Sequence, residues 1–387
     1  MIARIREWLR RRADATPPDP DAQWKQARAL QVERRFAEAA SAYEALAAQL
    51  EAPGERARLA AVMNQLGLAR LRMNDFDRAR APLERAATLV PEDPSYSGCA
   101  RFPALMSRDL PLDREAMPPS PRAGSAAIEA EIAYFFVGRA QAPSYAEYCA
   151  LLALSLRLAR RALPGCRTVI LTDEGTPFPE DVVADEIARL PLATDAIMLA
   201  RLQAMAAYLG RRANEDAGRP ILFCDPDTEL LRDPSEAFAA GADIAFAARS
   251  DFVDARLDHE PFTAGAIYAR ATQAAAGFFA RAAAELDAID AWPEVRGFYP
   301  RSLREWRGDQ LVPAALVGWR AYAEHVLSGS TDRLRIGDAE VAFVPSARFC
   351  RTWQAGLDEA SLGDTVLLDY KGGRKAAMLA RHRDGAR

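Results

Sequence analysis

Short apolar runs alternate with longer helix-like segments between residues 132 and 224, and this order constrains the fold more than any other feature of the chain. The runs that predict strands lie at 132–137, 168–172, 187–192 and 221–224. Segments with a helical spacing of apolar residues lie between them, at 145–163 and 194–211. Short connections between such elements favour an α/β fold, with a mostly parallel sheet covered by helices on both faces. Ligands of such folds bind at the carboxyl ends of the strands.

Two aspartates stand directly after the last of these runs. Because successive side chains of an extended chain alternate faces, Asp225 and Asp227 are expected to project to the same side. Two carboxylates about 4 Å apart repel by roughly 4 kcal/mol at an effective dielectric of about 20, so the pair should share a proton or bind a cation. Mn²⁺ or Mg²⁺ suits an all-oxygen site and leaves positions for substrate phosphates. The motif therefore predicts metal-assisted diphosphate chemistry.

Composition and spacing argue against several other function classes. Fifty lysines and arginines against 54 acidic residues give a net charge of −4, so no overall charge favours a nucleic-acid partner. The five cysteines are scattered without CxxC spacing, which argues against a zinc knuckle and a disulfide framework and predicts buried thiols. Neither GxGxxG nor GxxxxGK[ST] follows the first strand, so dinucleotide and P-loop sites are not indicated.

Residues 1–21 predict a basic helix followed by a proline-rich linker. Ile2, Ile5, Trp8 and Leu9 lie on one helical face among arginines, without the apolar core of a signal peptide. The helix either makes a weak contact with a membrane surface or packs on the next domain. No run reaches the roughly 18 apolar residues that span a bilayer. We therefore expect a cytoplasmic protein, with a position at the inner face of a membrane as the alternative.

Residues 22–100 predict a small all-α region with an internal repeat. Phe36-Ala37-Glu38-Ala39 is echoed by Phe76-Asp77-Arg78-Ala79 forty residues later, each after a polar turn. With Leu66-Gly67 before the second copy, the pattern resembles a tetratricopeptide helix pair. Small residues at Gly67 and Ala79 would let two helices approach closely. Two interpretations remain: a groove that binds a protein partner, or a helical cap on the following domain.

Residues 101–127 are expected to form a connector, because prolines recur from 103 to 122, and residues 128–387 to form the catalytic domain. Several motifs of this last region resemble those of GT-A nucleotide-sugar glycosyltransferases, specifically family 8-like and related nucleotide-diphospho-sugar transferases. The motifs are Met198–Leu202, Pro220–Pro234 with its Asp-x-Asp, Phe262–Gly265, Gly308–Gln310 and Asp369–Lys375. The resemblance implies a Rossmann-like GT-A fold over about residues 131–381.

The same resemblance implies roles for individual residues. Asp225 and Asp227 would hold Mn²⁺ or Mg²⁺ on the diphosphate of a nucleoside-diphosphate sugar. Asp309 and Gln310 would line the sugar and the side where an unidentified acceptor binds. The residues that would flank the phosphates are Arg201, Lys371, Gly372, Arg374 and Lys375.

Two positions depart from the family pattern. The family commonly has a histidine before the lysine-glycine loop as a further metal ligand, whereas this chain has Asp369, which is itself a competent oxygen ligand. Where Asn-x-Gly is usual, this chain has Thr263-Ala264-Gly265. Thr263 can still donate and accept a hydrogen bond to a donor or acceptor group, and the alternative is a plain turn before a strand at 266–268.

Each basic or polar candidate also has a structural interpretation. The loop from Lys371 to Lys375 places cations and backbone amides where phosphates can approach, or it is a solvated basic tail. Arg201 reaches a diphosphate or makes an ion pair on its helix. Asp309 hydrogen-bonds a sugar, with Gln310 stabilising positive charge at the anomeric carbon, or Asp309 caps the helix that follows.

The chain is therefore expected to transfer a sugar from a nucleoside diphosphate to an acceptor hydroxyl. One alternative is a degenerate transferase domain that serves as a protein-interaction scaffold beside the helical repeat. A second is a haloacid-dehalogenase-like phosphatase, whose DxDx[TV] motif also follows an apolar strand. Glu229 stands where that motif needs Thr or Val, and the acids come after three earlier strands rather than near the domain start.

Overall fold

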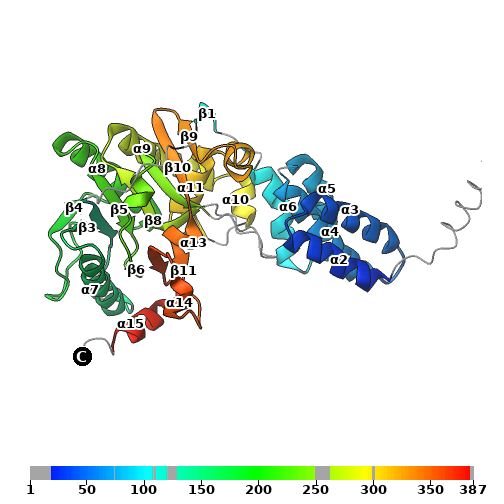
Figure 1. Ribbon diagram of the computed structural model, residues 1–387, viewed down its shortest axis with the longest axis horizontal. Helices are drawn as coiled ribbons and strands as arrows, with labels where there is room; N and C mark the ends of the chain where they lie inside the picture. Colours follow the sequence, from blue (N-terminus) through cyan, green and yellow to red (C-terminus); the bar gives the residue numbers. More distant parts are fainter. Residues whose placement is uncertain are drawn as a thin grey trace, which may run out of the picture. The chain divides into compact units, whose positions relative to one another are not determined.

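The computed structural model describes residues 19–73, 75–106, 108, 110–118, 120, 129–248, 262–298 and 301–383 (Figure 1). The chain divides between residues 107 and 108 into two compact units, here called the helical unit and the sheet unit. The amphipathic helix expected within residues 1–18 lies outside the described residues. None of the helices in the described ranges is long and apolar enough to cross a membrane.

The helical unit consists of successive helices that pack on one another in chain order. They are α2 (Pro20–Val32), α3 (Phe36–Gln49), α4 (Arg56–Arg72), α5 (Phe76–Leu89) and α6 (Pro94–Met106). The two copies of the repeat thus begin α3 and α5. A Cβ on Gly67 would lie 2.3 Å from Cγ of Leu83, so the glycine permits the close approach of α4 and α5.

The connector expected at 101–127 differs from the structure in two of its described segments. Helix α6 continues through Pro103 to Met106, because Phe102 and Leu105 are buried and their packing outweighs the proline. Farther on, Arg114–Ala116 forms strand β1, which pairs antiparallel with β9. Part of the expected connector therefore belongs to the sheet unit.

The sheet unit is built on a nine-stranded sheet with the order β1-β9-β10-β7-β8-β5-β2-β3-β4. Strands β5 (Pro220–Cys224), β2 (Glu131–Phe135), β3 (Arg167–Asp173) and β4 (Glu186–Leu190) are mutually parallel. Beyond β5 the sheet is mixed: β8 (Phe262–Arg270) runs antiparallel to β5 and to β7 (Ile244–Ala248). Then β10 (Ala339–Pro345) is parallel to β7, and β9 (Arg333–Ile336) is antiparallel to β10. The predicted α/β fold is confirmed, with its parallel part in the segment where strands and helices alternate.

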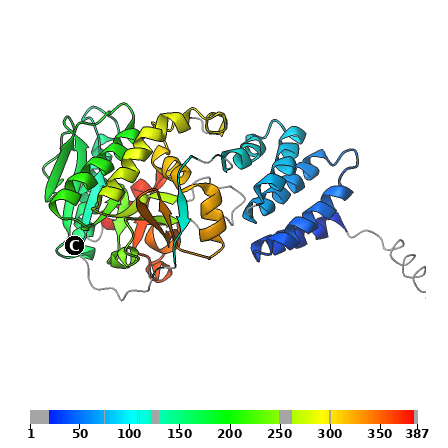
Figure 2. The same cartoon turned by 90° about the horizontal axis from the view of Figure 1, so that it is seen from above.

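Helices cover both faces of this sheet (Figures 1 and 2). On one face, α7 (Tyr145–Ala162) packs through Leu152 and Leu156 in a cluster that includes Leu222 of β5. On the other, α8 (Ile197–Glu215) places Tyr208 against Phe223, with ring centroids 6.5 Å apart. Helices α9 (Gln273–Asp290) and α11 (Gly308–Val317) pack with α8. The opposite faces reached by residues 222 and 223 follow from the alternation of side chains along a strand.

The sheet unit also contains a small three-stranded sheet, with the order β11-β12-β6. It contains β6 (Thr228–Leu230), β12 (Leu367–Asp369) and β11 (Arg351–Thr352). The antiparallel pairing of β6 with β12 sets Thr228 opposite Asp369. Strand β6, which begins just after Asp227, is thus paired with β12, which ends at Asp369, the third predicted metal ligand.

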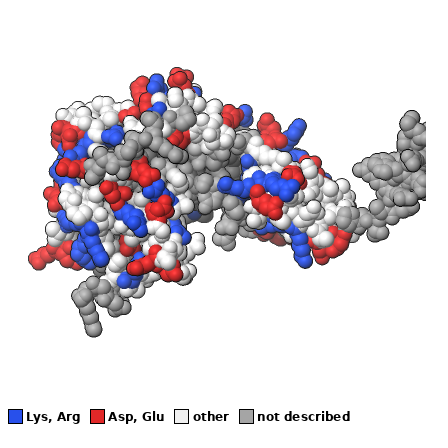
Figure 3. Space-filling view, in the orientation of Figure 1, with Lys and Arg blue, Asp and Glu red and all other residues white. Residues whose placement is uncertain are grey.

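Shorter elements fill the remaining connections. They are η1 (Ser235–Phe238), α10 (Pro293–Phe298), α12 (Trp319–Ala321), η2 (Tyr322–Leu327), α13 (Ser346–Phe349), α14 (Glu359–Leu362), η3 (Gly372–Arg374) and α15 (Lys375–Arg383). All five cysteines are buried and free, as predicted. Acidic and basic side chains are interspersed on the face shown in Figure 3, in keeping with the nearly balanced composition.

Candidate functional site

The Asp-Pro-Asp turn lies at the carboxyl end of β5 and is held by hydroxyl groups. The hydroxyl of Thr228 donates to the carbonyl of Asp225 at 2.7 Å. The hydroxyl of Ser155 on α7 lies 2.8 Å from the carbonyl oxygens of both Pro226 and Thr228. Ser155 is fully buried, so α7 fixes the backbone that carries the two acids.

Arg201 on α8 lies between two carboxylates. Its Nη1 is 2.6 Å from Oδ1 of Asp225 and 2.9 Å from Oδ2 of Asp309, while Nη2 donates to the carbonyl of Ala264 at 2.7 Å. The Arg201 side chain is only 5% exposed. Both of its terminal amino groups are therefore engaged within the protein. Arg201 therefore joins Asp225 to Asp309, which is the ion-pair alternative of the sequence analysis. Its contact with a diphosphate stays a prediction.

The carboxyl group of Asp225 has a raised pKa. Loss of solvation raises its pKa to about 7; attraction to Arg201 opposes the rise, and repulsion from Asp227, Asp369 and Asp309 adds to it. Its side chain nevertheless remains 29% exposed. Asp225 thus stands at the open edge of a group of four neighbouring acids, where an added cation would favour its ionised form.

Each of the other two predicted metal ligands is paired with a lysine. Nζ of Lys375 lies 2.8 Å from Oδ2 of Asp227, and Nζ of Lys371 lies 3.0 Å from Oδ2 of Asp369. The backbone N–H of Lys371 also donates to Oδ1 of Asp369 at 3.2 Å. Both aspartates are buried. The acids and the basic loop, far apart in sequence, therefore meet at one site.

A glycine of β8 packs directly against Asp369. A Cβ on Gly265 would lie 2.9 Å from Oδ2 of Asp369 and 3.2 Å from Sγ of Cys350. Burial, with repulsion from Asp369, raises the pKa of the Cys350 thiol to about 12, so the thiol stays neutral. Only a residue without a side chain fits at position 265 while Asp369 keeps its place.

The neighbouring prediction for Thr263 is wrong in its structural part. Strand β8 begins at Phe262, so Thr263-Ala264-Gly265 is neither a turn nor a loop before a strand at 266–268. Thr263 is buried within the strand, beside Ala247 of β7 in the ladder. Pairing with β7 extends the strand to these residues because it satisfies their backbone hydrogen-bonding groups. The contact of Thr263 with a donor or acceptor group stays a prediction.

Asp309 and Gln310 lie in the first turn of α11, as predicted. The residue before the helix is Arg307, in the left-handed region at φ 66°, and a Cβ on Gly308 would lie 2.2 Å from the carbonyl oxygen of Leu303. Asp309 is not the N-cap of α11, and its carboxylate pairs with Arg201 instead. The buried Oε1 of Gln310 has no hydrogen-bond partner among the described residues.

The loop from Lys371 to Lys375 turns sharply at Gly372, whose φ is +68°. Nothing lies within 4 Å of where a Cβ would stand on Gly372 or Gly373, and Arg374 is exposed. Lys375 opens helix α15 and lies over the ring of Tyr148, with Nζ 5.3 Å from the centroid. The loop is therefore open beside its two glycines, and its two lysines lie against acids rather than free in solvent.

The donor set suits a hard divalent cation, although not as a preformed three-ligand cage. Among the described residues no group of three histidine, cysteine or acidic side chains is placed to hold a metal ion together. Asp225 and Asp227 offer carboxylate oxygens, and burial, with a further contribution from the neighbouring acids, raises the pKa of Asp225. Mg²⁺ is commonly bound by one or two carboxylates together with water and substrate phosphates. Asp369, bonded to Lys371 and buried, stands as a third ligand only if that lysine moves.

The sequence did not reveal two residues that support the site through contacts with its backbone or with a neighbouring helix, Ser155 and Glu229. Ser155 carried no signal, because a serine within an apolar helix is ordinary. Glu229 carried one: it repeats the alternation of Asp225 and Asp227 into β6, and an acid within a short strand is unusual. The Nε2 of His382 lies 3.1 Å from Oε1 of Glu229.

Comparison with protein families matches residues 215–371 to the family model described as nucleotide-diphospho-sugar transferase. Among solved structures, a glycosyltransferase involved in glycosylation of the major capsid of PBCV-1 is 10% identical, with 64% of this chain and 99% of that chain covered and a TM-score of 0.35. The glycosyltransferase GlyE of Streptococcus pneumoniae TIGR4 is 11% identical, with 66% and 64% covered and a TM-score of 0.35.

No curated protein matches the chain. The family match begins before β5 and ends at Lys371, so it spans the Asp-Pro-Asp turn, the start of α11 and Asp369. Residues 215–371 therefore carry the sequence signature of a nucleotide-diphospho-sugar transferase domain.

Proposed function

We propose that the chain is a metal-dependent glycosyltransferase, which moves a sugar from a nucleoside-diphosphate donor to the hydroxyl group of an acceptor. One observation carries the proposal. Asp225, Asp227 and Asp369 collect at the carboxyl end of β5 together with Lys371 and Lys375. This is the edge of a parallel sheet where ligands bind, and all of these residues except Lys375 lie in the matched region.

Charge supports a role for Mn²⁺ or Mg²⁺. The site holds four carboxylates, those of Asp225, Asp227, Asp309 and Asp369, against the cations of Arg201, Lys371 and Lys375. A diphosphate adds further negative charge, which such a site would repel without a cation. When bound, a divalent cation neutralises the charge that develops on the leaving diphosphate.

The chain's own lysines supply the remaining positive charge. Lys371 and Lys375 now lie against Asp369 and Asp227, and their flexible stems allow each ammonium to turn to phosphate oxygens in the same site. Charge-assisted hydrogen bonds of this kind are among the stronger ones. The left-handed turn at Gly372 leaves open space beside the loop for that approach.

Asp309 and Gln310 serve the sugar side. Arg201 holds the carboxylate of Asp309 in place, so it presents a fixed acceptor for a sugar hydroxyl. The unpaired Oε1 of Gln310 lies on the next residue, where a hydroxyl of the sugar or of the acceptor would satisfy it. Its dipole also favours positive charge at the anomeric carbon as the bond to the diphosphate breaks.

The catalytic proposal is tested by sugar transfer from a panel of nucleoside-diphosphate sugars with Mn²⁺ present. We expect Asp225→Ala to abolish turnover. A matched control is Asp364→Ala, since Asp364 is an exposed acid that pairs with Arg348 away from the lysines. Activity of Asp225→Ala close to that of the wild-type chain would reject the role of this carboxylate.

Binding gives a separate test. Mn²⁺ and uridine diphosphate together should raise the melting temperature more than the sum of their separate effects, because a ligand that binds only the folded chain stabilises it. Absence of any shift, with the wild-type chain folded, would favour a non-catalytic scaffold over a transferase.

A further inference from the structure

A buried acid lies outside the predicted set, two residues beyond Asp227. The side chain of Glu229 on β6 is 4% exposed. Tyr370 donates its hydroxyl to Oε2 of Glu229 at 2.7 Å, Nε2 of His382 lies 3.1 Å from Oε1, and Nε of Arg381 lies 3.8 Å from Oε2. The partners therefore come from the end of β12 and from α15. A buried carboxylate is costly unless such partners compensate it.

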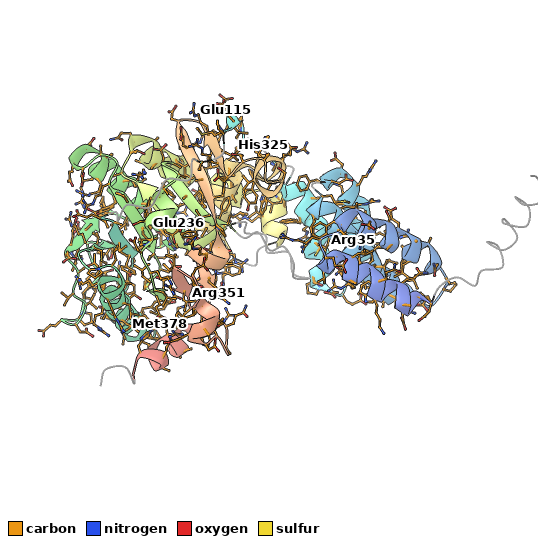
Figure 4. All side chains as sticks on the ribbon, in the orientation of Figure 1. Arg35, Glu115, Glu236, His325, Arg351 and Met378 are labelled. Carbon is orange, nitrogen blue, oxygen red and sulfur yellow. The ribbon has the colours of Figure 1, made fainter. Side chains whose placement is uncertain are left out.

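Three residues on one face of helix α15 contact other parts of the sheet unit. Lys375, Met378 and His382 are spaced by three and four residues, so they lie along one side of the helix. Met378 is fully buried in a cluster with Leu151, Leu154 and Leu158 of α7 (Figure 4). Lys375 reaches Asp227 at one end of this face, and His382 reaches Glu229 at the other.

The contacts of Lys375 with Asp227 and of His382 with Glu229 follow the same order along the two segments. Asp227 lies at the end of the Asp-Pro-Asp turn, and Glu229 follows two residues later within β6. Lys375 and His382 are seven residues apart on a helix, about 10 Å along its axis. A lysine at the head of α15 is thus held over the diphosphate site by a second attachment two turns away, with Met378 packed between the two.

We propose that Glu229 is a positioning residue, which anchors α15 and thereby holds Lys375 where it meets the diphosphate of the donor. The proposal rests on the proposed function, since it assigns Lys375 to the donor. Glu229 itself touches neither the donor nor the cation. Its effect on ligand binding passes through the helix.

The experiment compares the affinity of the full chain for uridine diphosphate, with Mn²⁺ present, by calorimetric titration. The variants are Glu229→Gln, Lys375→Met and the double variant. Gln keeps an acceptor for Tyr370 but removes the charge that faces Arg381 and His382. We expect Lys375→Met to weaken binding about tenfold and Glu229→Gln about three- to tenfold. The double variant should be no weaker than Lys375→Met within about twofold, because the anchor has no effect without the lysine.

Hydrogen exchange supplies a readout that needs no ligand. Peptides covering 375–383 should exchange at least tenfold faster in Glu229→Gln, while peptides of α7 and β5 keep their wild-type rates. A control is Glu236→Gln on η1, because Glu236 is 53% exposed, pairs with Arg348 and is labelled in Figure 4. It should change neither the affinity nor the exchange. Met378→Ala loosens the same helix from its apolar side. It should reproduce the weaker binding and faster exchange expected for Glu229→Gln, and it provides the test if Glu229→Gln folds poorly.

Three results would overturn the positioning role: wild-type affinity in Glu229→Gln, effects of Glu229→Gln and Lys375→Met that multiply in the double variant, or unchanged exchange of 375–383. If the wild-type chain binds uridine diphosphate and Lys375→Met weakens it, these results leave the proposed function intact. If the wild-type chain binds neither uridine diphosphate nor the diphosphates of adenosine, guanosine and thymidine, the proposed function fails, and the assignment of Lys375 to the donor fails with it.

Discussion

Replacement of Arg201 by methionine tests how the site holds its acids. The guanidinium of Arg201 bridges Asp225 and Asp309 at 2.6 and 2.9 Å, and its side chain is 5% exposed. Methionine replaces the aliphatic part of the arginine side chain and carries no charge. The change therefore leaves the carboxylate of Asp309 buried and removes the attraction that opposes the raised pKa of Asp225.

The expected loss is large for a single substitution. Removal of one partner from a buried ion pair costs about 3–5 kcal/mol, because the other charge stays buried without compensation. Whole domains are stable by only about 5–15 kcal/mol. We therefore expect the sheet unit of Arg201→Met to lose about 3 kcal/mol or more of unfolding free energy at pH 8.

The loss should depend on pH in one direction. Removal of the cation moves the pKa of Asp225 further upward in the folded chain and leaves that of the unfolded chain unchanged. The folded variant then binds more protons than the unfolded one across neutral pH, and its unfolding free energy falls as pH rises. The deficit relative to the wild-type chain should accordingly shrink from pH 8 to pH 5.

Urea unfolding, followed by hydrogen exchange in peptides from β5, reports the sheet unit separately. Asp309→Asn placed in the Arg201→Met background should recover part of the loss, since it removes the stranded charge. Arg211→Met on the same helix is the control: Arg211 is 41% exposed and pairs with Glu186, so its loss should cost at most about 1 kcal/mol. An Arg201→Met chain within 1 kcal/mol of wild type at pH 8 would refute the buried-bridge reasoning.

Three further predictions concern the same site. Because the pKa of Asp225 is about 7 in the folded chain, above its unfolded value, the unfolding free energy of the sheet unit should fall as pH rises from about 4 to about 7, and Asp225→Asn should lack this component in urea titrations. Gly265→Ala, whose Cβ would stand 2.9 Å from a carboxylate oxygen of Asp369, should reduce the thermal stabilisation by Mn²⁺ with uridine diphosphate, whereas Gly277→Ala, with nothing within 4 Å, should not. Ser155→Ala removes the hydroxyl that lies 2.8 Å from two carbonyls of the Asp-Pro-Asp turn, and it should cost about 1–3 kcal/mol by urea unfolding; a change below 0.5 kcal/mol would contradict that role.

Local pattern was enough to predict the strands and helices of the alternating segment. The runs at 168–172 and 221–224 lie within β3 and β5, and the helix expected at 145–163 is α7 with its end moved by one residue. Apolar periodicity encodes these elements because each must bury one face or both against neighbours. The same pattern placed Asp225 and Asp227 at the end of a strand, at the sheet edge where ligands bind.

Tertiary structure alone decided which groups meet those acids. Asp369 comes beside them because β12 pairs with β6, and no local signal in either three-residue strand specifies a partner about 140 residues away. Arg201 turned out to bridge two acids, Thr263 to lie inside a strand, and Glu229 to hold α15, since each depends on packing between distant elements. The sequence by itself determined the strands and helices of the alternating segment and the acidic pair, because these follow from short-range periodicity. The partners of each charge were decided by long-range pairing and burial, whose free energies depend on the whole fold.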